Sequence, residues 1–211
     1  MICAGIVQVA EQLDFLPKDD GSIPISPLQL RFQAISAQNM NRIVVENHYA
    51  HRPVSSSWSW GAYFNGRLLG VISYGKPASP SPCDAVCGSE YSSRVYELNR
   101  LWIDDVAPKN SESRFISWTL RQLKNIRPSL ILLSYADTDY GHLGIIYSAT
   151  NWIYTGITKE RIDSVVPGHH SRHHVGALEK QKRSIKHRFV YFTDKSDIRY
   201  LRWPIVKWSK A

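Results

Sequence analysis

Residues 97–118, which read ELNRLWIDDVAPKNSESRFISW, combine an apolar strand-like run with polar residues that open a helix-like segment. A strand that leads into a helix presents unpaired backbone N–H groups and the positive end of the helix dipole, and both favour an anion. Asn110, Ser111 and Ser113 could add side-chain donors, and Arg100 could add a positive charge. The stretch therefore suits a phosphate or pyrophosphate group.

The same stretch also allows a purely structural interpretation. Ser111 could cap the helix, and Arg100 could form an ion pair with Asp104 or Asp105. Serine is one of the preferred residues at helix N-termini. The local pattern alone therefore favours a cap over a ligand site.

Titratable side chains gather after the next apolar strand, in SYADTDYGHLGIIYSATN at 134–151. Ligands of open α/β sheets bind at the carboxyl ends of the strands. Titratable groups gathered there are therefore stronger evidence for a ligand site than the same groups scattered along the chain. In a structural interpretation, Asp137 or Asp139 caps the following helix and Tyr147 packs in the core, and the sequence leaves both interpretations open. The polar candidates in this stretch are Ser134, Asp137, Asp139, His142 and Tyr147.

Histidines occur in two groups, one around Tyr49 and one in GHHSRHH at 168–174. His48 and His51 have the i, i+3 spacing that can ligate a metal from one helical face, and a neighbouring tyrosinate is a plausible iron ligand. Glu97 is the candidate carboxylate for such a site. Neither group carries a specific metal signature, and the second is equally well interpreted as a solvated basic loop.

The charge balance predicts a polyanionic partner. The 211 residues include 26 Lys and Arg against 18 Asp and Glu, which gives a net charge of +8 and a pI of about 9.4. The stretches EKQKRSIKHRFVYF and RYLRWPIVKWSK interleave these cations with aromatic residues. Cations contact phosphates and aromatic planes stack on bases, so this mixture suits a flipped or unpaired nucleotide. A basic amphipathic strand would show a similar mixture.

The cysteines predict a reduced, cytosolic type of protein. Cys3, Cys83 and Cys87 are odd in number and lack the spacing of a zinc site. The N-terminal run MICAGIVQVAEQLDF has no basic region before it and soon meets acidic residues. We therefore expect neither a signal peptide nor a membrane span there.

Hydrophobic periodicity predicts an α/β fold with a mixed central sheet flanked by helices. The most specific local signal is Asn65-Gly66, because a type I′ hairpin turn needs positive φ at both central residues. The long Pro, Ser and Cys stretch 76–93 is predicted to be a loop. The expected strands are 28–36, 58–64, 67–75, 94–104, 129–135, 152–157 and 187–192, and the expected helices are 37–49, 111–125 and 143–151.

Composition also predicts three parts of the chain. Residues 1–27 end in the Pro- and Gly-containing connection PKDDGSIPISP and are expected to be an N-terminal extension. Residues 28–193 are expected to form the folded domain. Residues 194–211 are expected to form a basic tail that contains tryptophan.

Three blocks of the sequence resemble the Mom DNA-modification proteins of Mu-like bacteriophages. They are ELNRLW, KNSESRFISW and SYADTDYGHLGIIYSATNWIYTG, and the resemblance extends over roughly 30–193. It implies a fold similar to the GCN5-related N-acetyltransferases (GNAT fold). It also implies conversion of adenine in DNA to N6-carbamoylmethyladenine, a mark that protects phage DNA from host restriction enzymes in the host cytoplasm.

The resemblance implies functional roles for Arg100, Ser113, Asp137 and Tyr147. Acetyltransferases of this fold carry an R/Q-x-x-G-x-G/A loop before the long helix, whereas this chain has PKNSES at 108–113. Acetyl-CoA or a related acyl donor would then be held by donors of Asn110, Ser111 and Ser113 in place of close glycine backbone. An iron-assisted step with His48, Tyr49 and Glu97 is a second option.

The implied mechanism assigns one role to each residue. Asp137 would orient or deprotonate the exocyclic amine of a flipped adenine, Tyr147 would act as general acid, and Arg100 with Ser113 would hold the donor. Two other functions fit the sequence. One is an acetyl-CoA-dependent N-acetyltransferase that acts on a small amine or a protein, and the other is a non-catalytic basic DNA-binding module.

Overall fold

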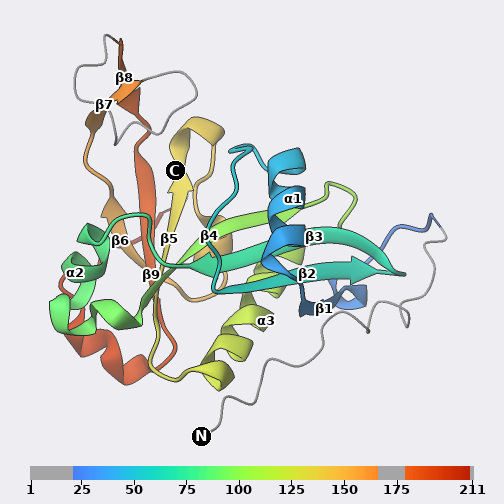
Figure 1. Cartoon of the computed structure of the whole chain (residues 1–211). Coiled ribbons are helices and arrows are strands. Elements are labelled where there is room, and N and C mark those ends of the chain that lie inside the picture. The colour runs from blue at the N-terminus through green and yellow to red at the C-terminus, as the bar shows by residue number, and fades with distance from the viewer. Residues whose placement is uncertain (1–20, 166–178, 210–211) are drawn as a thin grey trace, which may run out of the picture. The chain divides into compact units, whose positions relative to one another are not determined.

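The computed structural model describes residues 21–165 and 179–209 of the chain. It confirms the α/β class, with a seven-stranded sheet in the order β1-β2-β3-β4-β5-β9-β6, helices beside it and a separate two-stranded sheet β7-β8 (Figure 1). The chain divides into two compact units, 1–132 with 192–202 and 133–191 with 203–211, which are described in turn. No helix of the described residues is long and apolar enough to cross a membrane.

The first unit contains four antiparallel strands in chain order. Their central hairpin turns at Asn65 and Gly66, which have φ of 46° and 83°, so the predicted turn is confirmed. The short helix η2 (Pro27–Gln29) precedes the first strand. The strands are β1 (Arg31–Ala34), β2 (Trp58–Phe64), β3 (Arg67–Gly75) and β4 (Val95–Ile103).

Helices α1 (Ala37–Asn47) and α3 (Ser111–Ile126) cover opposite faces of these four strands (Figure 1). Met40 and Val44 of α1 pack on Val71 of β3. On the other face, Phe115 of α3 stacks on Phe32 at 4.6 Å between ring centroids. Because successive strand residues point to opposite faces, the alternating apolar residues of β3 supply both cores.

The predicted loop at 76–93 was wrong, because it contains two short helices. Helix α2 (Ser81–Cys87) is followed by η3 (Ser89–Arg94). Two of the prolines that suggested a loop, Pro80 and Pro82, lie at the start of α2, where a missing N–H costs nothing. Cys83 and Cys87 are buried free thiols. Burial raises the pKa of Cys87 to about 11, so this thiol stays protonated and unreactive at neutral pH.

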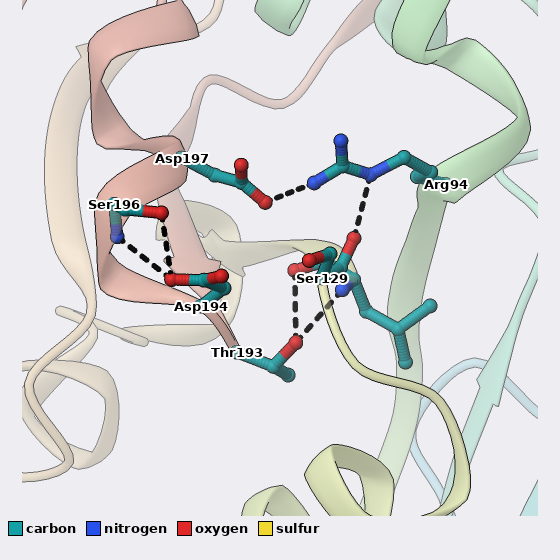
Figure 2. A network of polar contacts seen from close by, with 7 residues as sticks. Arg94, Ser129, Thr193, Asp194, Ser196 and Asp197 are labelled. Atoms are coloured by element: carbon teal, nitrogen blue, oxygen red, sulfur yellow. Dashed lines mark hydrogen bonds and ion pairs between the residues drawn. The ribbon is translucent and has the colours of Figure 1, made fainter.

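A polar network joins residues 192–202 to the rest of the first unit (Figure 2). Arg94 forms an ion pair with Asp197 of η6 (Lys195–Tyr200) and donates to the Ser129 carbonyl at 2.7 Å. The Thr193 hydroxyl accepts from the Leu130 N–H at 2.7 Å. The start of the expected tail, 194–202, is therefore held to the first unit by the largely buried contact of Asp197 with Arg94.

The second unit takes in the remaining strands of the main sheet, although β5 begins two residues before it and β9 ends one residue after it. Strands β6 and β9 are antiparallel, with Ile153 opposite Val190. The predicted helix at 143–151 is reduced to a single turn. The elements are β5 (Ile131–Asp137), η4 (Thr138–Tyr140), α4 (Ile145–Ser148), β6 (Ile153–Ile157) and β9 (Lys186–Phe192).

An additional hairpin in this unit was absent from the sequence-based prediction. Strands β7 (Arg161–Val165) and β8 (Glu179–Arg183) form a two-stranded antiparallel sheet with Arg161 opposite Arg183. Strand β8 has no apolar residue and β7 has only Ile162 and Val165, so neither shows the apolar alternation that marks a strand. The histidine-rich stretch 168–174 lies outside the described residues, so its predicted metal-binding role stays a prediction.

Candidate functional site

A β-bulge in β4 brings Glu97 and Arg100 to one face of the sheet. Leu98 pairs with Tyr74 and Arg100 pairs with Ser73, so Asn99 is an extra residue in β4. Residues three apart in a regular strand point to opposite faces, and one inserted residue restores them to the same face. Both side chains therefore lie on the α1 side of β4.

Asn99 itself is held by two hydrogen bonds. Its side-chain oxygen accepts from the Ser73 hydroxyl at 2.6 Å, and its side-chain nitrogen donates to the Ser55 carbonyl at 3.1 Å. A Cβ at Gly75 would collide with that same carbonyl, so glycine is required for the close approach. The bulge is thus built into the packing of the loop after α1.

Arg100 is a partly buried cation with spare hydrogen-bonding capacity. Its guanidinium donates to the carbonyls of Asn99 at 2.6 Å and Arg52 at 3.3 Å. Its Nε is buried without a hydrogen-bond partner among the described residues. Burial lowers the pKa of Arg100, while Tyr49 and Glu97 act to raise it. A desolvated guanidinium with an unsatisfied N–H suits an anionic ligand.

The predicted ion pair between Arg100 and Asp104 is wrong. Asp104 forms its ion pair with Arg67, at 3.1 Å. Its other oxygen accepts from the Val106 N–H at 3.1 Å, which closes the turn after β4. Asp104 is thus engaged in holding the strand end.

The segment after α1 differs from the predicted helix 37–49. Helix α1 ends at Asn47, His48 is extended and His51 has φ of 43°, so the two histidines do not share a helical face. The His48 ring lies 4.2 Å from the Tyr49 ring between centroids. His48 Nδ1 accepts from the Ala50 N–H at 3.0 Å. His48, which was predicted to bind a metal, therefore forms a hydrogen bond with the local backbone instead.

The predicted iron site at His48, Tyr49 and Glu97 is not supported. No group of three or more His, Cys, Asp or Glu side chains in the described parts of the chain is placed to hold a metal ion. An accepting Nδ1 also fixes the proton of a neutral His48 ring at Nε2, which removes the lone pair that a metal would need. The structure instead places Tyr49 and Glu97 in the electrostatic surroundings of Arg100.

The loop before α3 has the backbone conformation that a glycine would normally supply. Asn110 is the N-cap, has φ of 71° and makes no side-chain capping bond. Asn is the residue after glycine that best tolerates this left-handed region. The N–H groups of Glu112 and Ser113 in the first turn lack intrahelical partners. The loop therefore offers backbone donors to an anion without any glycine.

The predicted hydroxyl donors of this loop are already engaged. The Ser111 hydroxyl donates to the Pro108 carbonyl at 2.6 Å, and its side chain is fully buried. The Ser113 hydroxyl donates to the Asn110 carbonyl at 3.1 Å. Ser111 is thus the first helical residue and not the cap. Ser113 can serve an anion through its backbone N–H while its hydroxyl shapes the loop.

Replacement of Asn110 tests the role of its conformation. We expect Asn110→Gly to change the free energy of unfolding by less than about 0.5 kcal/mol, and Asn110→Val to lower it by about 1–2 kcal/mol, because only Val is strained at positive φ. Urea denaturation measures both values. The matched control is Asn125→Val in the same helix, where Asn and Val have similar helix propensities. Equal losses from Asn110→Val and Asn125→Val would contradict this explanation.

Asp137, at the end of β5, is a buried carboxylate with three donors. It is 4% exposed; Lys186 Nζ lies 2.6 Å and the Ser184 hydroxyl 3.0 Å from its Oδ2. The Asp139 N–H donates to its Oδ1 at 3.2 Å, so Asp137 caps η4, whereas the N-cap of α4 is Gly144 and not the predicted Asp. Burial acts to raise the pKa of Asp137, but the bonds from Lys186 and Ser184 outweigh it, and the pKa lies below its usual value. Asp137 is therefore ionised at neutral pH.

Tyr147, in the single turn α4, is buried among aromatic rings. Its ring centroid lies 5.4 Å from Trp152 and 5.1 Å from Phe189. The predicted packing role is therefore confirmed, and a chemical role would have to be played by its hydroxyl. Ser134 is also buried, whereas Asp139 and His142 are exposed.

The predicted residues fall into two groups. The first unit holds the residues around Arg100 and the α3 loop, and the second unit holds Asp137 and Tyr147. Sequence reasoning missed Ser184 and Lys186 as partners of Asp137, because Ser184 is 47 positions away and no local pattern links the two. It also missed the bulge at Asn99, which has no glycine to mark it.

Comparison with known proteins identifies the family. The family model described as the Mom protein family matches residues 29–210. The chain belongs to the Mom protein family. It is 35% identical over 130 residues to methylcarbamoylase mom of Escherichia phage Mu, which covers 61% of this chain. The match covers 54% of that relative, so the Mom-family chain spans about half the length of the curated protein.

Solved structures confirm a GNAT-like fold for the Mom-family chain. One is yncA of Salmonella typhimurium, solved with acetyl-CoA, at 9% identity and a TM-score of 0.51 over 79% of this chain and 95% of that one. Another is the spermidine/spermine N-acetyltransferase SpeG of Vibrio cholerae, at 10% identity and a TM-score of 0.50 over 82% and 98%. At these identities the comparison shows the fold alone.

Proposed function

We propose that this protein is a DNA-modifying transferase that converts adenine in double-stranded DNA to N6-carbamoylmethyladenine. The observation that carries the proposal is membership of the Mom family over residues 29–210, with a relative named methylcarbamoylase. A phage protein of this kind acts on DNA in the host cytoplasm and protects it from restriction enzymes.

The chemistry replaces one hydrogen of the adenine N6 amine. An N6–CH2 bond forms, the bond between the CH2 carbon and its leaving group breaks, and the N6 proton ends on a base or on the leaving group. Simple acetyl transfer would join N6 to a carbonyl carbon instead. The two products differ in composition by one NH, so mass spectrometry separates them.

Asp137 is suited to hold the adenine amine. An ionised carboxylate accepts an N–H hydrogen bond, and its lowered pKa makes Asp137 a weak base toward a neutral amine. Alkylation makes N6 cationic and much more acidic, so even a weak base can then take its proton. Asp137 would thus orient the amine first and receive the proton late. Tyr147 would donate a proton to the leaving group through its hydroxyl.

The first unit is suited to hold a donor with phosphate groups. The unpaired N–H groups of Glu112 and Ser113 would contact a pyrophosphate, and Arg100 would add a positive charge beside its unsatisfied Nε. These residues fit acetyl-CoA or a related acyl donor. A thioester alone would join N6 to its carbonyl carbon, so the donor would also have to carry a leaving group on the CH2 carbon and the amide nitrogen of the product.

The β7–β8 hairpin is suited to contact duplex DNA. A two-stranded β-ribbon fits the major groove, and basic side chains contact phosphates. Ile162 and Lys182 on the hairpin are exposed. Basic residues outnumber acidic ones in and beside the described strands of the hairpin. They are Lys159, Arg161, Lys180, Lys182 and Arg183, against Glu160, Asp163 and Glu179.

Loss of two exposed lysines tests this contact. We expect Lys159→Gln combined with Lys182→Gln to weaken binding to duplexes of any sequence and to reduce the slope of log K against log salt by roughly 2, because two phosphate contacts are lost. Fluorescence anisotropy at several salt concentrations measures the slope. The control is Lys195→Gln combined with Lys124→Gln, two exposed lysines of the first unit. An equal fall of the slope in both double variants would contradict a specific role of the hairpin.

Mass spectrometry of nucleosides tests the proposed function. DNA from cells that express the protein should contain N6-carbamoylmethyladenine. The same DNA should resist restriction enzymes that cut unmodified DNA. An acetylated small amine or protein with unchanged DNA would identify an ordinary N-acetyltransferase. Salt-sensitive DNA binding with unchanged nucleosides would identify a binding module.

A further inference from the structure

Ser184 and Ile185 lie between β8, which ends at Arg183, and β9, which begins at Lys186. Strand pairing is interrupted at these two residues, where the β7–β8 hairpin joins the main sheet. Ile157 pairs with His187 below the break, and Arg161 pairs with Arg183 above it. A strand break leaves backbone and side-chain polar groups that need other partners. The residues at the break are therefore available to neighbouring elements of the same unit.

Polar groups of the residues at and next to this break interact with the end of β5. The Ile185 carbonyl accepts from both the N–H and the hydroxyl of Thr138, at 3.2 and 2.6 Å. Ser184 donates to Asp137 Oδ2, and Lys186 Nζ lies 2.6 Å from the same oxygen. Three consecutive residues of the hairpin base thus hold two consecutive residues at the strand end.

We propose that Ser184 and Lys186 are positioning residues, which hold the Asp137 carboxylate ionised and in one orientation for the adenine amine. This inference rests on the function proposed for Asp137. A carboxylate oxygen has two lone pairs, and Oδ2 uses both on Lys186 and Ser184. Oδ1 accepts one N–H, from Asp139, and so keeps one lone pair for a substrate donor.

Lys186 is the charged group that acts on this carboxylate. Among the described residues, Lys186 is the cation that lowers the pKa of Asp137, and the hydrogen bonds from Ser184 and the Asp139 N–H act in the same direction. On η4 and the loop after it, the Asp139 carboxylate and the His142 ring are exposed. The His142 N–H donates to the Asp137 carbonyl at 3.1 Å. The Lys186 side chain is 30% exposed, so its charge is partly desolvated and acts at short range.

The test measures Asp137 directly and then measures the reaction. The carboxyl carbon of Asp137 is titrated by 13C NMR in the full chain and assigned with Asp137→Asn. In Lys186→Gln the midpoint should move to higher pH, because loss of the cation disfavours the ionised form. Lys186→Arg, which keeps the charge, should stay closer to the wild type. Ser184→Ala should raise the midpoint less than Lys186→Gln, and Lys195→Gln should leave it unchanged.

The reaction supplies a second readout that a structural role would not move. Lys186→Gln should form modified adenine about 10- to 100-fold more slowly at neutral pH, since a misplaced group loses effective orientation. The acidic limb of its pH profile should move to higher pH, in the same direction as the NMR midpoint. Lys186→Arg should recover most of the rate.

The outcomes separate this inference from the proposed function. An unchanged NMR midpoint in folded Lys186→Gln would overturn the inference, whatever the activity. A raised midpoint with an unmoved acidic limb would show that the reaction does not depend on this carboxylate, and would also overturn it. A wild-type protein that gives no modified adenine would refute the proposed function, while the NMR titration would still decide whether Lys186 and Ser184 control Asp137.

Discussion

Asp137→Asn should lower the formation of N6-carbamoylmethyladenine by at least about 100-fold. The amide keeps the size of the side chain but loses the negative charge that accepts the amine hydrogen bond and the late proton. Lys186 also loses its ionic partner at 2.6 Å. Mass spectrometry of nucleosides from DNA incubated with equal amounts of folded protein measures the rate.

Asp139→Asn is the matched control for this substitution. It removes the same charge two residues away, from a side chain that is exposed. We expect its rate to stay within about 2-fold of the wild type, because exposed charges at this distance are screened. Wild-type activity of Asp137→Asn, or equal losses in both variants, would remove Asp137 from the mechanism.

Asp197→Ala should lower the free energy of unfolding by about 3 kcal/mol, the largest stability effect that we expect in the chain. The Asp197 side chain is 7% exposed and its partner Arg94 is 23% exposed (Figure 2). The substitution leaves a largely buried guanidinium, for which the Ser129 carbonyl is the one acceptor left among the described residues. Urea denaturation of the full chain measures the loss.

Two further variants decide whether unpaired charge is the cause. Arg94→Met combined with Asp197→Leu should be more stable than Asp197→Ala, since no buried charge is left alone. Glu90→Gln breaks the Arg202–Glu90 pair, whose side chains are 56–59% exposed, and should cost less than about 1 kcal/mol. If the double variant were the least stable of the three, packing and not charge would explain the effect.

Several elements of the first unit could be predicted because their signals are local. Ser36 caps α1 through the Asn39 N–H at 3.2 Å, as its residue type predicts. The Asn65-Gly66 turn follows from the positive φ that both residues accept. Helix α3 begins and ends within a residue of its prediction, because its apolar stripe has helical spacing and Pro128 prevents its continuation. In each case neighbours in the sequence determine the conformation.

The errors arise where residues distant in sequence decide the structure. Helix α2 forms in a stretch rich in Pro and Ser, because its apolar side chains are buried in the core. They are Cys83, Val86 and Cys87. The helix before His48 ends at Asn47, and the Asn41 side chain exchanges two hydrogen bonds with the Val54 backbone, at 3.0 and 2.9 Å, which hold the following loop against α1. These partners cannot be identified from periodicity.

The sequence by itself determined the family, the α/β class and the residue types at the candidate site, because motif blocks and amphipathic spacing are properties of short segments. Only the tertiary structure decided how those residues are used. It showed the Asn99 bulge that aligns Glu97 with Arg100, and the left-handed Asn110 in place of a glycine. It also showed Lys186 on Asp137. Strand registers, bulges and buried ion pairs depend on which distant segments pack together, and local spacing does not encode that choice.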